Sequence, residues 1–226
     1  TEAAFSSGWN RIKLYFMLGL PTEINEDVLE IVRLIREIRA QGRAIRRRHV
    51  DINVSAATFV PKPYTPFQWI PLAEREVNEQ RQRLLRDGAR ARGVRVSYSN
   101  WESTWLEAIL SRGDRRLGPV IYRAWRLGAR FDAWSERFRP DLWRQALEQE
   151  QVDPAFYTTR PREANENLPW DQIDVGVTKS FLWREYQKSL TGELSPDCRG
   201  TCHHCGILMA FARERSKLGE PGWGCP

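Results

Sequence analysis

Four cysteines gather near the end of the chain at a spacing that suits a metal site. Three fall within eight residues and the fourth follows two glycines; they are Cys198, Cys202, Cys205 and Cys225. A disulfide framework would be spread over a whole domain, whereas these four lie within the last 29 residues. The sequence therefore predicts a metal centre at these cysteines, with His203 or His204 able to replace one thiolate.

These ligands are compatible with either zinc or an iron–sulfur cluster. Four thiolates, or three with one imidazole, suit a structural zinc ion, and four thiolates equally suit a cluster. The remaining alternative is that the tail carries reduced free thiols and binds no metal.

Two segments marked by glycine and proline follow predicted strands and are candidates for ligand binding. They are residues 19–23, with the sequence Gly-Leu-Pro-Thr-Glu, and residues 59–67, which contain three prolines. In parallel α/β sheets, ligands gather at the C-terminal ends of the strands. Gly19 would let a ligand approach the backbone, and Thr22 and Glu23 would offer polar contacts. The alternative is that both segments are rigid turns.

The apolar pattern predicts the elements that position these segments. Strands are expected over 12–18, where the unbroken apolar run is typical of a strand covered on both faces, and over 50–60 and 94–98. Amphipathic helices are expected from Asn25 to Gly42 and from Leu72 to Gly93, which implies parallel strands joined by helical crossovers. Further helices are expected over 101–111, 117–127, 131–149 and 179–190, with an irregular connector over 152–169.

Composition limits the class of protein. The chain has 226 residues, 41% of them hydrophobic, and includes ten tryptophans, which excludes a wholly disordered chain. It contains no apolar run of about 18 residues and no secretion signal, so we expect a cytoplasmic protein without a membrane span. Since Thr1 is not an initiator methionine and residues 2–5 read like the end of a helix, we expect a fragment of a longer protein.

Several strings resemble the radical S-adenosylmethionine enzymes, in particular members with an upstream cobalamin-binding domain. FMLGLPTEINED (16–27) and NVSAATFVPKPYTPFQW (53–69) are similar to late strands of the barrel of that family. Residues 111–134 and 169–206 look like one subfamily of these proteins. The resemblance implies the C-terminal part of a radical S-adenosylmethionine (β/α) partial TIM barrel over 1–99, a helical Trp/Arg-rich extension over 100–190 and a cysteine-rich metal-binding tail over 191–226.

The resemblance also implies the chemistry. The full-length enzyme would use S-adenosylmethionine and a four-iron four-sulfur cluster to make a 5'-deoxyadenosyl radical, or would transfer a methyl group with cobalamin, on an unknown substrate such as RNA or a protein. By motif position, the residues near the bound S-adenosylmethionine would be Gly19, Leu20, Pro21, Thr22, Glu23, Pro63, Thr65 and Pro66.

The cysteine spacing Cys198-x3-Cys202-x2-Cys205 equals that of the family's catalytic cluster motif, but its place in the chain differs. In the family, that motif lies in the loop after the first barrel strand, whereas only 21 residues follow Cys205. We therefore expect the catalytic cluster cysteines upstream of Thr1, an auxiliary cluster or zinc at the tail, and no activity from this chain alone.

A second hypothesis is a non-catalytic, basic RNA-binding module with a structural zinc tail. The net charge is +6, and arginines and tryptophans could hold RNA or phosphate by ion pairing and stacking. The residues concerned are Arg112, Asp114, Arg115, Arg116, Arg123, Arg126, Arg130, Trp125 and Trp134. The alternative is a helix surface on which these arginines pair with acids.

Overall fold

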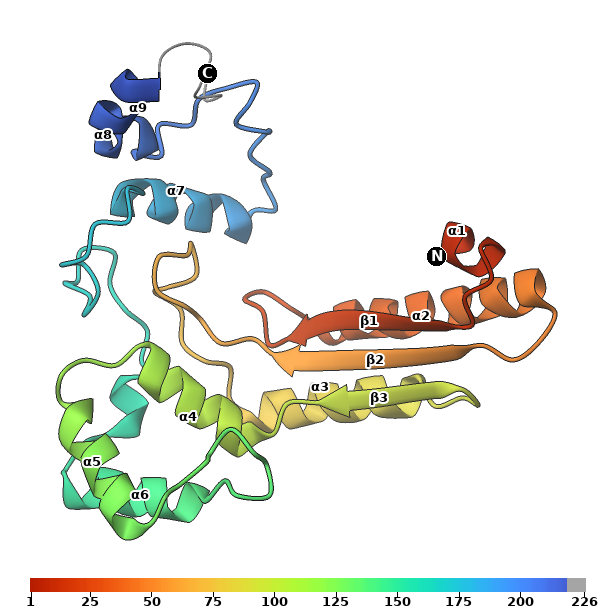
Figure 1. Cartoon of the computed structure of the whole chain (residues 1–226), viewed down its shortest axis with the longest axis horizontal. Helices are drawn as coiled ribbons and strands as arrows, with labels where there is room; N and C mark the ends of the chain where they lie inside the picture. The colour runs from red at the N-terminus through yellow and green to blue at the C-terminus, as the bar shows by residue number, and fades with distance from the viewer. Residues whose placement is uncertain (219–226) are drawn as a thin grey trace. The chain divides into compact units, whose positions relative to one another are not determined.

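The computed structural model describes residues 1–218, which form two compact units (Figure 1). The first, the sheet unit, comprises Thr1–Val60, Leu72–Ala108 and Ala129–Arg144. The second, the helical unit, comprises Pro61–Pro71, Ile109–Gly128 and the described residues from Gln145 onward. Segments of the two units alternate along the chain, and the predicted division at residues 99 and 190 stays a prediction.

Helices and strands follow one another as a mixed α/β chain. In order, the elements are α1 (Glu2–Ser6), β1 (Arg11–Leu18), α2 (Asn25–Arg46), β2 (Asp51–Thr58), α3 (Arg75–Gly88), β3 (Val94–Tyr98), α4 (Trp101–Ser111), α5 (Leu117–Leu127), α6 (Pro140–Gln149), a 3-10 turn (Pro154–Phe156), α7 (Lys179–Leu190), α8 (Ile207–Ala210) and α9 (Ala212–Leu218). None of the helices formed by residues 1–218 combines the length and apolar character needed to cross a membrane.

The sheet unit contains a three-stranded parallel sheet in the order β1-β2-β3, as the sequence predicts. Ile12, Ile52 and Val94 stand in register across the three strands. Helices α2 and α3 lie on one face of the sheet, behind the strands in Figure 1. The predicted apolar stripe of α2 is buried there: Val28, Val32, Ile35 and Ile38 are each at most 7% exposed. Burial of this stripe is what fixes the helix on the sheet.

The other face of the sheet remains exposed and is mainly polar. In β1 the exposed residues alternate with buried or half-buried ones, and Tyr15 is 70% exposed. Within residues 1–218 this strand is therefore covered on one face, whereas the sequence predicts cover on both. The register aligns Lys13 with Asn53 and Arg95, and aligns Tyr15 with Ser55 and Ser97. Because side chains in register point to the same face, these residues form two polar rows across the sheet.

Three helices have boundaries that differ from those predicted; α3 spans Arg75–Gly88 rather than Leu72 to Gly93. Helix α2 continues through Gly42 to Arg46. A side chain at Gly42 would lie 2.6 Å from the ring of Phe5, so glycine at this position lets α1 pack against the helix. Helix α6 begins at Pro140 rather than near Phe131, which has a left-handed φ of 58°. Proline at the first position of a helix has no amide hydrogen to lose, so Pro140 starts the helix instead of breaking it.

The helical unit is built around the segment Pro61–Pro71. Trp69 is 2% exposed and packs in a cluster with Leu168, Trp170 and Leu182. Its ring lies 5.0 Å from that of Trp183 in an edge-to-face arrangement, so α7 covers this segment with aromatic side chains.

Candidate functional site

The first candidate segment, residues 19–23, forms a tight loop at the C-terminal end of β1. The carboxylate of Glu23 turns back and accepts hydrogen bonds from the backbone N–H of Gly19 at 3.1 and 3.2 Å and from that of Leu20 at 3.4 Å. Arg81 of α3 holds the same carboxylate, with Nε 2.9 Å from Oε1, and also donates to the Glu23 carbonyl. These charge-assisted hydrogen bonds hold the loop in one conformation.

Gly19 is required in this loop by a close approach of α3. Its φ is +89°, and a side chain there would place Cβ 2.8 Å from Oδ1 of Asn78. Asn78 is fully buried and donates from Nδ2 to the carbonyls of Ala73 and Glu74 at 3.0 and 3.1 Å. Thr22 also has a left-handed φ of 65°, with Pro21 before it. The loop therefore presents a rigid edge at the end of β1.

Residues 61–67 of the second candidate segment lie in the helical unit, where Tyr64 and Thr65 form hydrogen bonds within the unit. The Tyr64 N–H donates to Oε1 of Gln68 at 3.2 Å, and the Thr65 hydroxyl donates to the Lys62 carbonyl at 2.8 Å. Oε1 of Gln68 also accepts from the indole N–H of Trp170 at 2.7 Å. The turn after β2 that contains Pro63, Thr65 and Pro66 is therefore held by internal hydrogen bonds. That these residues lie beside a cofactor shared with residues 19–23 stays a prediction.

Tyr64 anchors this turn to the connector before α7. Its hydroxyl donates to the Trp170 carbonyl and lies 3.0 Å from the Ile173 carbonyl. Burial and the carboxylates of Asp171 and Asp174 raise the pKa of Tyr64, which keeps the phenol protonated as a donor. The same two aspartates order the connector, because Asp171 accepts from Lys179 and Asp174 accepts from the Gly176 N–H.

Two buried arginines donate hydrogen bonds to backbone carbonyls of the helical unit. Arg112 is 0% exposed and donates to the Ile70 carbonyl at 2.9 Å. Arg162 is 6% exposed and donates to the Tyr157 carbonyl at 3.3 Å, and burial lowers the pKa of its guanidinium. The expectation that Arg112 lies on a surface, either paired with acids or binding RNA, is wrong, since its side chain belongs to the interior of the helical unit.

Other arginines of the predicted RNA-binding block bond to acids within their own unit. Arg116 forms a two-point pair with Asp114, with Nη2 2.6 Å from Oδ2, and Arg123 bonds Glu150 at 2.8 Å. Tyr157 donates to the same Asp114, so the pKa of that carboxyl is lowered, first by Arg116 and further by Tyr157. These pairs favour a structural role for this block.

The three described cysteines of the tail line one cavity of about 1180 Å³ at the N-terminal end of α7. Its wall includes the thiol-bearing and imidazole-bearing residues Cys198, Cys202, Cys205, His203 and His204. The apolar part of the wall comes from Val177, Phe181, Ile207, Leu208 and Met209. All three described cysteines are free thiols. The structure thus brings together three of the four predicted ligands and both alternative histidines, while Cys225 lies outside the described residues.

Backbone contacts position the tail against α7. The Thr178 N–H donates to the Cys205 carbonyl at 2.7 Å, and a side chain at Gly206 would lie 2.7 Å from Cγ2 of Thr178. The sulfur of Cys202 accepts the N–H of His204 at 3.5 Å. A hydrogen bond from Ser195 lowers the pKa of Glu185 and ties the start of the tail to the helix.

The donor set of this cavity fits a thiolate-bound metal. Soft sulfur ligands with neighbouring imidazoles suit zinc or an iron–sulfur cluster and are poor ligands for magnesium or calcium. Among residues 1–218, no three Cys, His, Asp or Glu side chains already stand at ligand distances from one point. Metal binding would therefore draw the three sulfurs together within the cavity that they line.

Comparison with known proteins finds similarity to a protein whose role is unassigned. The chain is 32% identical over 121 residues to an uncharacterized protein of Methanocaldococcus jannaschii; the aligned part is 53% of this chain and 25% of that protein. The chain thus spans about a quarter of the length of this relative. No protein-family model matches the chain, and no solved structure matches it.

Proposed function

We propose that this chain is part of a cytoplasmic radical S-adenosylmethionine iron–sulfur enzyme, associated with cobalamin and acting on an unknown substrate. In this proposal the sheet unit is a portion of a partial (β/α) barrel. The cysteines of the catalytic cluster and the cobalamin-binding domain would belong to another part of a longer protein.

The observation that carries this proposal is the distribution of side chains on the two faces of the parallel sheet. Helices α2 and α3 cover one face, as they would on the outside of a barrel. The other face carries the polar rows Lys13, Asn53, Arg95 and Tyr15, Ser55, Ser97. A barrel that is only a packed core carries branched apolar residues on its inner face, whereas a barrel that holds a ligand needs polar groups there.

The rigid loops at the strand ends support the same assignment. Active sites of β/α barrels lie at the C-terminal ends of the strands, which is where residues 19–23 follow β1. S-adenosylmethionine and a four-iron cluster, when bound, would supply the radical chemistry there. Gly19, Leu20, Pro21, Thr22 and Glu23 would line the site of the S-adenosylmethionine. The bond from Arg81 to Glu23 would keep this wall from moving.

The assay is the formation of 5'-deoxyadenosine by the longer protein that contains these strands, purified without oxygen and supplied with a reductant and S-adenosylmethionine. We expect product by mass spectrometry, and a loss of about tenfold or more in Ser55→Leu, which puts an apolar side chain in a polar row. The matched control is Arg33→Ala, on the exposed side of α2, where within residues 1–218 its ion pair is with Glu30. The absence of product from a longer protein with an intact cluster would reject the proposal.

The 226-residue chain alone tests the assignment of the cysteines. We expect it to make no 5'-deoxyadenosine, because its only cysteines are those of the tail. Product from this chain would show that Cys198, Cys202 and Cys205 hold the catalytic cluster. A colourless chain with stoichiometric zinc would make the tail structural, and a brown chain with broad visible absorbance would make it an auxiliary cluster.

A further inference from the structure

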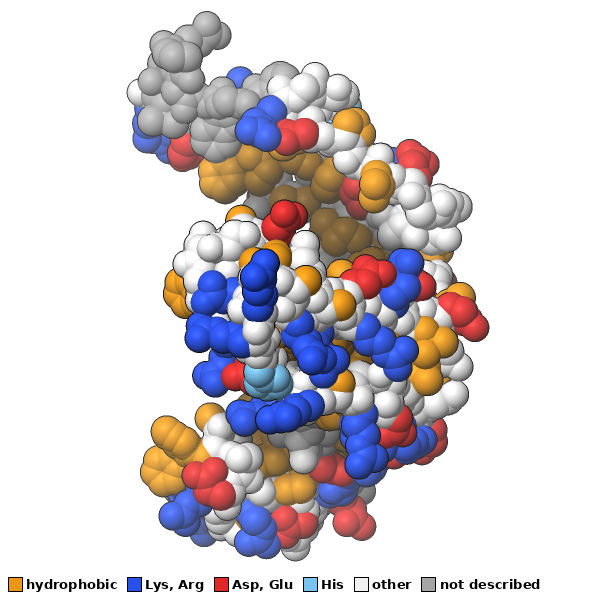
Figure 2. Space-filling view, turned by 90° about the vertical axis from the view of Figure 1, so that its right-hand side faces the viewer, with side chains coloured by type: hydrophobic (Ala, Val, Ile, Leu, Met, Phe, Trp, Pro, Cys, Tyr) orange, Lys and Arg blue, Asp and Glu red, His pale blue; other side chains and the backbone are white. Residues whose placement is uncertain are grey.

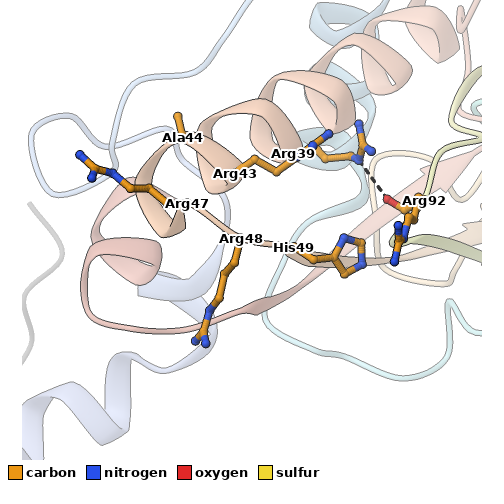
Figure 3. A pocket seen from close by; sticks show the side chains of 7 residues that line it. All are labelled: Arg39, Arg43, Ala44, Arg47, Arg48, His49 and Arg92. Atoms are coloured by element: carbon orange, nitrogen blue, oxygen red, sulfur yellow. Dashed lines mark hydrogen bonds between the residues drawn. The ribbon is translucent and has the colours of Figure 1, made fainter.

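A basic pocket of about 560 Å³ lies at the end of the sheet unit where β2 and β3 begin, away from the loop that follows β1. Its wall comes from the last turns of α2, from the connection to β2 and from the turn before β3. The lining residues are Arg39, Arg43, Ala44, Arg47, Arg48, His49 and Arg92 (Figure 3). Figure 2 shows Lys and Arg side chains gathered on this face around a histidine.

In the described part of the chain, the arginines of this pocket are not paired with acids, although its His49 lies 3.4 Å from a carboxylate oxygen of Asp51. Within residues 1–218, no carboxylate forms an ion pair with any of its five arginines. Arg39 donates to the Arg92 carbonyl at 3.1 Å, and Arg48 donates to the side-chain oxygen of Asn10 at 3.0 Å. By contrast, Arg75 and Arg139 of the same unit each pair with an acid. Uncompensated guanidinium groups on a concave surface attract anions.

The helix dipole explains only part of this charge. Arginine in the last turn of α2 stabilises the negative end of the helix, which accounts for Arg43 and Arg46. Arg47 follows the helix in the left-handed conformation, with φ of 52°, where glycine is the favoured residue. A side chain in that conformation costs about 1 kcal/mol. Arginine at this position, rather than glycine, points to a use for its charge.

The directions of the side chains favour an extended anion. Figure 3 shows Arg39 and Arg43 reaching toward Arg92, whereas Arg47 and Arg48 extend away in other directions. A second hollow of about 500 Å³ shares Arg92 and adds Arg90, which extends the basic surface along the unit; Arg86 also lines this hollow but pairs with Asp87 at 3.0 Å. Charges that diverge in this way fit a chain of phosphates better than one compact phosphate.

An exposed tryptophan stands beside these charges. Trp9 is 66% exposed and directly precedes Asn10, whose side-chain oxygen accepts from Arg46 at 3.1 Å and from Arg48 at 3.0 Å. Ala44 is the one apolar residue in the pocket wall, so the surface offers no broad apolar face for a bilayer. A basic groove with an exposed aromatic ring is the arrangement by which proteins hold single-stranded nucleic acid.

We infer that this surface binds the phosphate backbone of a single-stranded nucleic acid, with a base stacked on Trp9. Arginine suits this role because its planar guanidinium forms two-point bonds with phosphate. The site lies in the sheet unit, at the end of the sheet opposite the loop that follows β1, and the inference does not depend on the radical chemistry.

The test measures binding of a fluorescent oligouridylate of about 12 nucleotides to the 226-residue chain at several salt concentrations. We expect the triple variant Arg43→Ala, Arg47→Gly, Arg48→Ala to bind the oligonucleotide about tenfold more weakly. The plot of log K against log salt concentration should also become less steep by about two, because each lost phosphate contact removes about 0.7 from the magnitude of its slope. We expect Trp9→Ala to weaken binding about tenfold with the slope unchanged, because stacking releases no counterions.

The matched control removes three arginines that pair with acids in the same unit: Arg33, Arg83 and Arg139, each to alanine. Equal losses in the control and in the pocket variant would overturn the site, as would the absence of oligonucleotide binding. Displacement of the oligonucleotide by inorganic phosphate at equal concentration, or tighter binding to phosphatidylserine vesicles, would overturn the choice of partner. Thermal melts measure whether each variant is folded. Arg47→Gly relieves backbone strain and is expected to preserve the fold.

Discussion

Arg81 on α3 and Glu23 after β1 form an ion pair in which both side chains are almost fully buried, at 11% and 7% exposure. The pair joins the loop at the end of one strand to a helix 58 residues further along the chain. The Glu23 carboxylate also accepts from the backbone of Gly19 and Leu20, so one acidic group sets the shape of the whole loop.

Removing one member of this pair is expected to destabilise the sheet unit strongly. Arg81→Met leaves the carboxylate buried without its cation and should lower the free energy of unfolding by about 3 kcal/mol. Urea denaturation followed by circular dichroism measures this change. The control is Arg83→Ala on the same helix, where an exposed pair with Glu79 predicts a loss below about 0.5 kcal/mol. Similar losses in both variants would contradict the central role of Glu23.

Substitution of Gly19 is expected to be costly for a steric and a conformational reason. Gly19→Ala must adopt a φ of +89° and must push against Asn78, so we expect a loss of about 1–3 kcal/mol. Gly118→Ala serves as control, because a side chain there meets nothing within 4 Å and the residue lies in α5. Thermal unfolding should show a lower midpoint for the first variant and an unchanged or higher one for the second.

Acid should weaken the helical unit through Glu166. Bonds from Arg160 lower the pKa of this carboxyl below its usual 4.5 in the folded state. The folded protein then binds fewer protons than the unfolded chain, so this stability is complete above pH 4.5 and is lost as pH falls through the lowered pKa. Glu166→Gln should be less stable at pH 7 and less sensitive to acid in urea titrations. An equally steep acid dependence in this variant would refute the assignment.

The tail should bind metal through thiolates. Single serine substitutions at Cys198, Cys202 and Cys205 should each reduce the bound zinc or iron measured by plasma emission, and Cys225→Ser should show whether the fourth cysteine takes part. Metal should also be released on acidification, because protons compete for thiolates. Met209→Leu is the control, since Met209 lines the same cavity without a thiol. Unchanged metal content in all four serine variants would leave the tail with free thiols.

The local pattern of residues was sufficient to predict most elements. The bounds of α4, α5, α7 and β3 agree with those expected from the sequence, because each is a short segment whose apolar period or terminal residues signal its ends. The parallel pairing of β1 with β2 follows from the strand-helix-strand order, since a helical crossover returns the chain in the same direction. Cys198, Cys202 and Cys205 line one cavity because they are close in sequence, and their sharing of a metal stays a prediction.

Tertiary packing alone decided the relationships between distant residues. Arg81 pairs with Glu23, Arg112 lies inside the helical unit, and Arg92 meets the end of α2, although nothing near these residues in sequence marks them. An arginine has the same local pattern whether it faces water, a buried carboxylate or a backbone carbonyl, because that choice depends on which segment folds against it. Sequence periodicity thus determined which face of each element is apolar, and only the assembled structure determined what the polar groups meet.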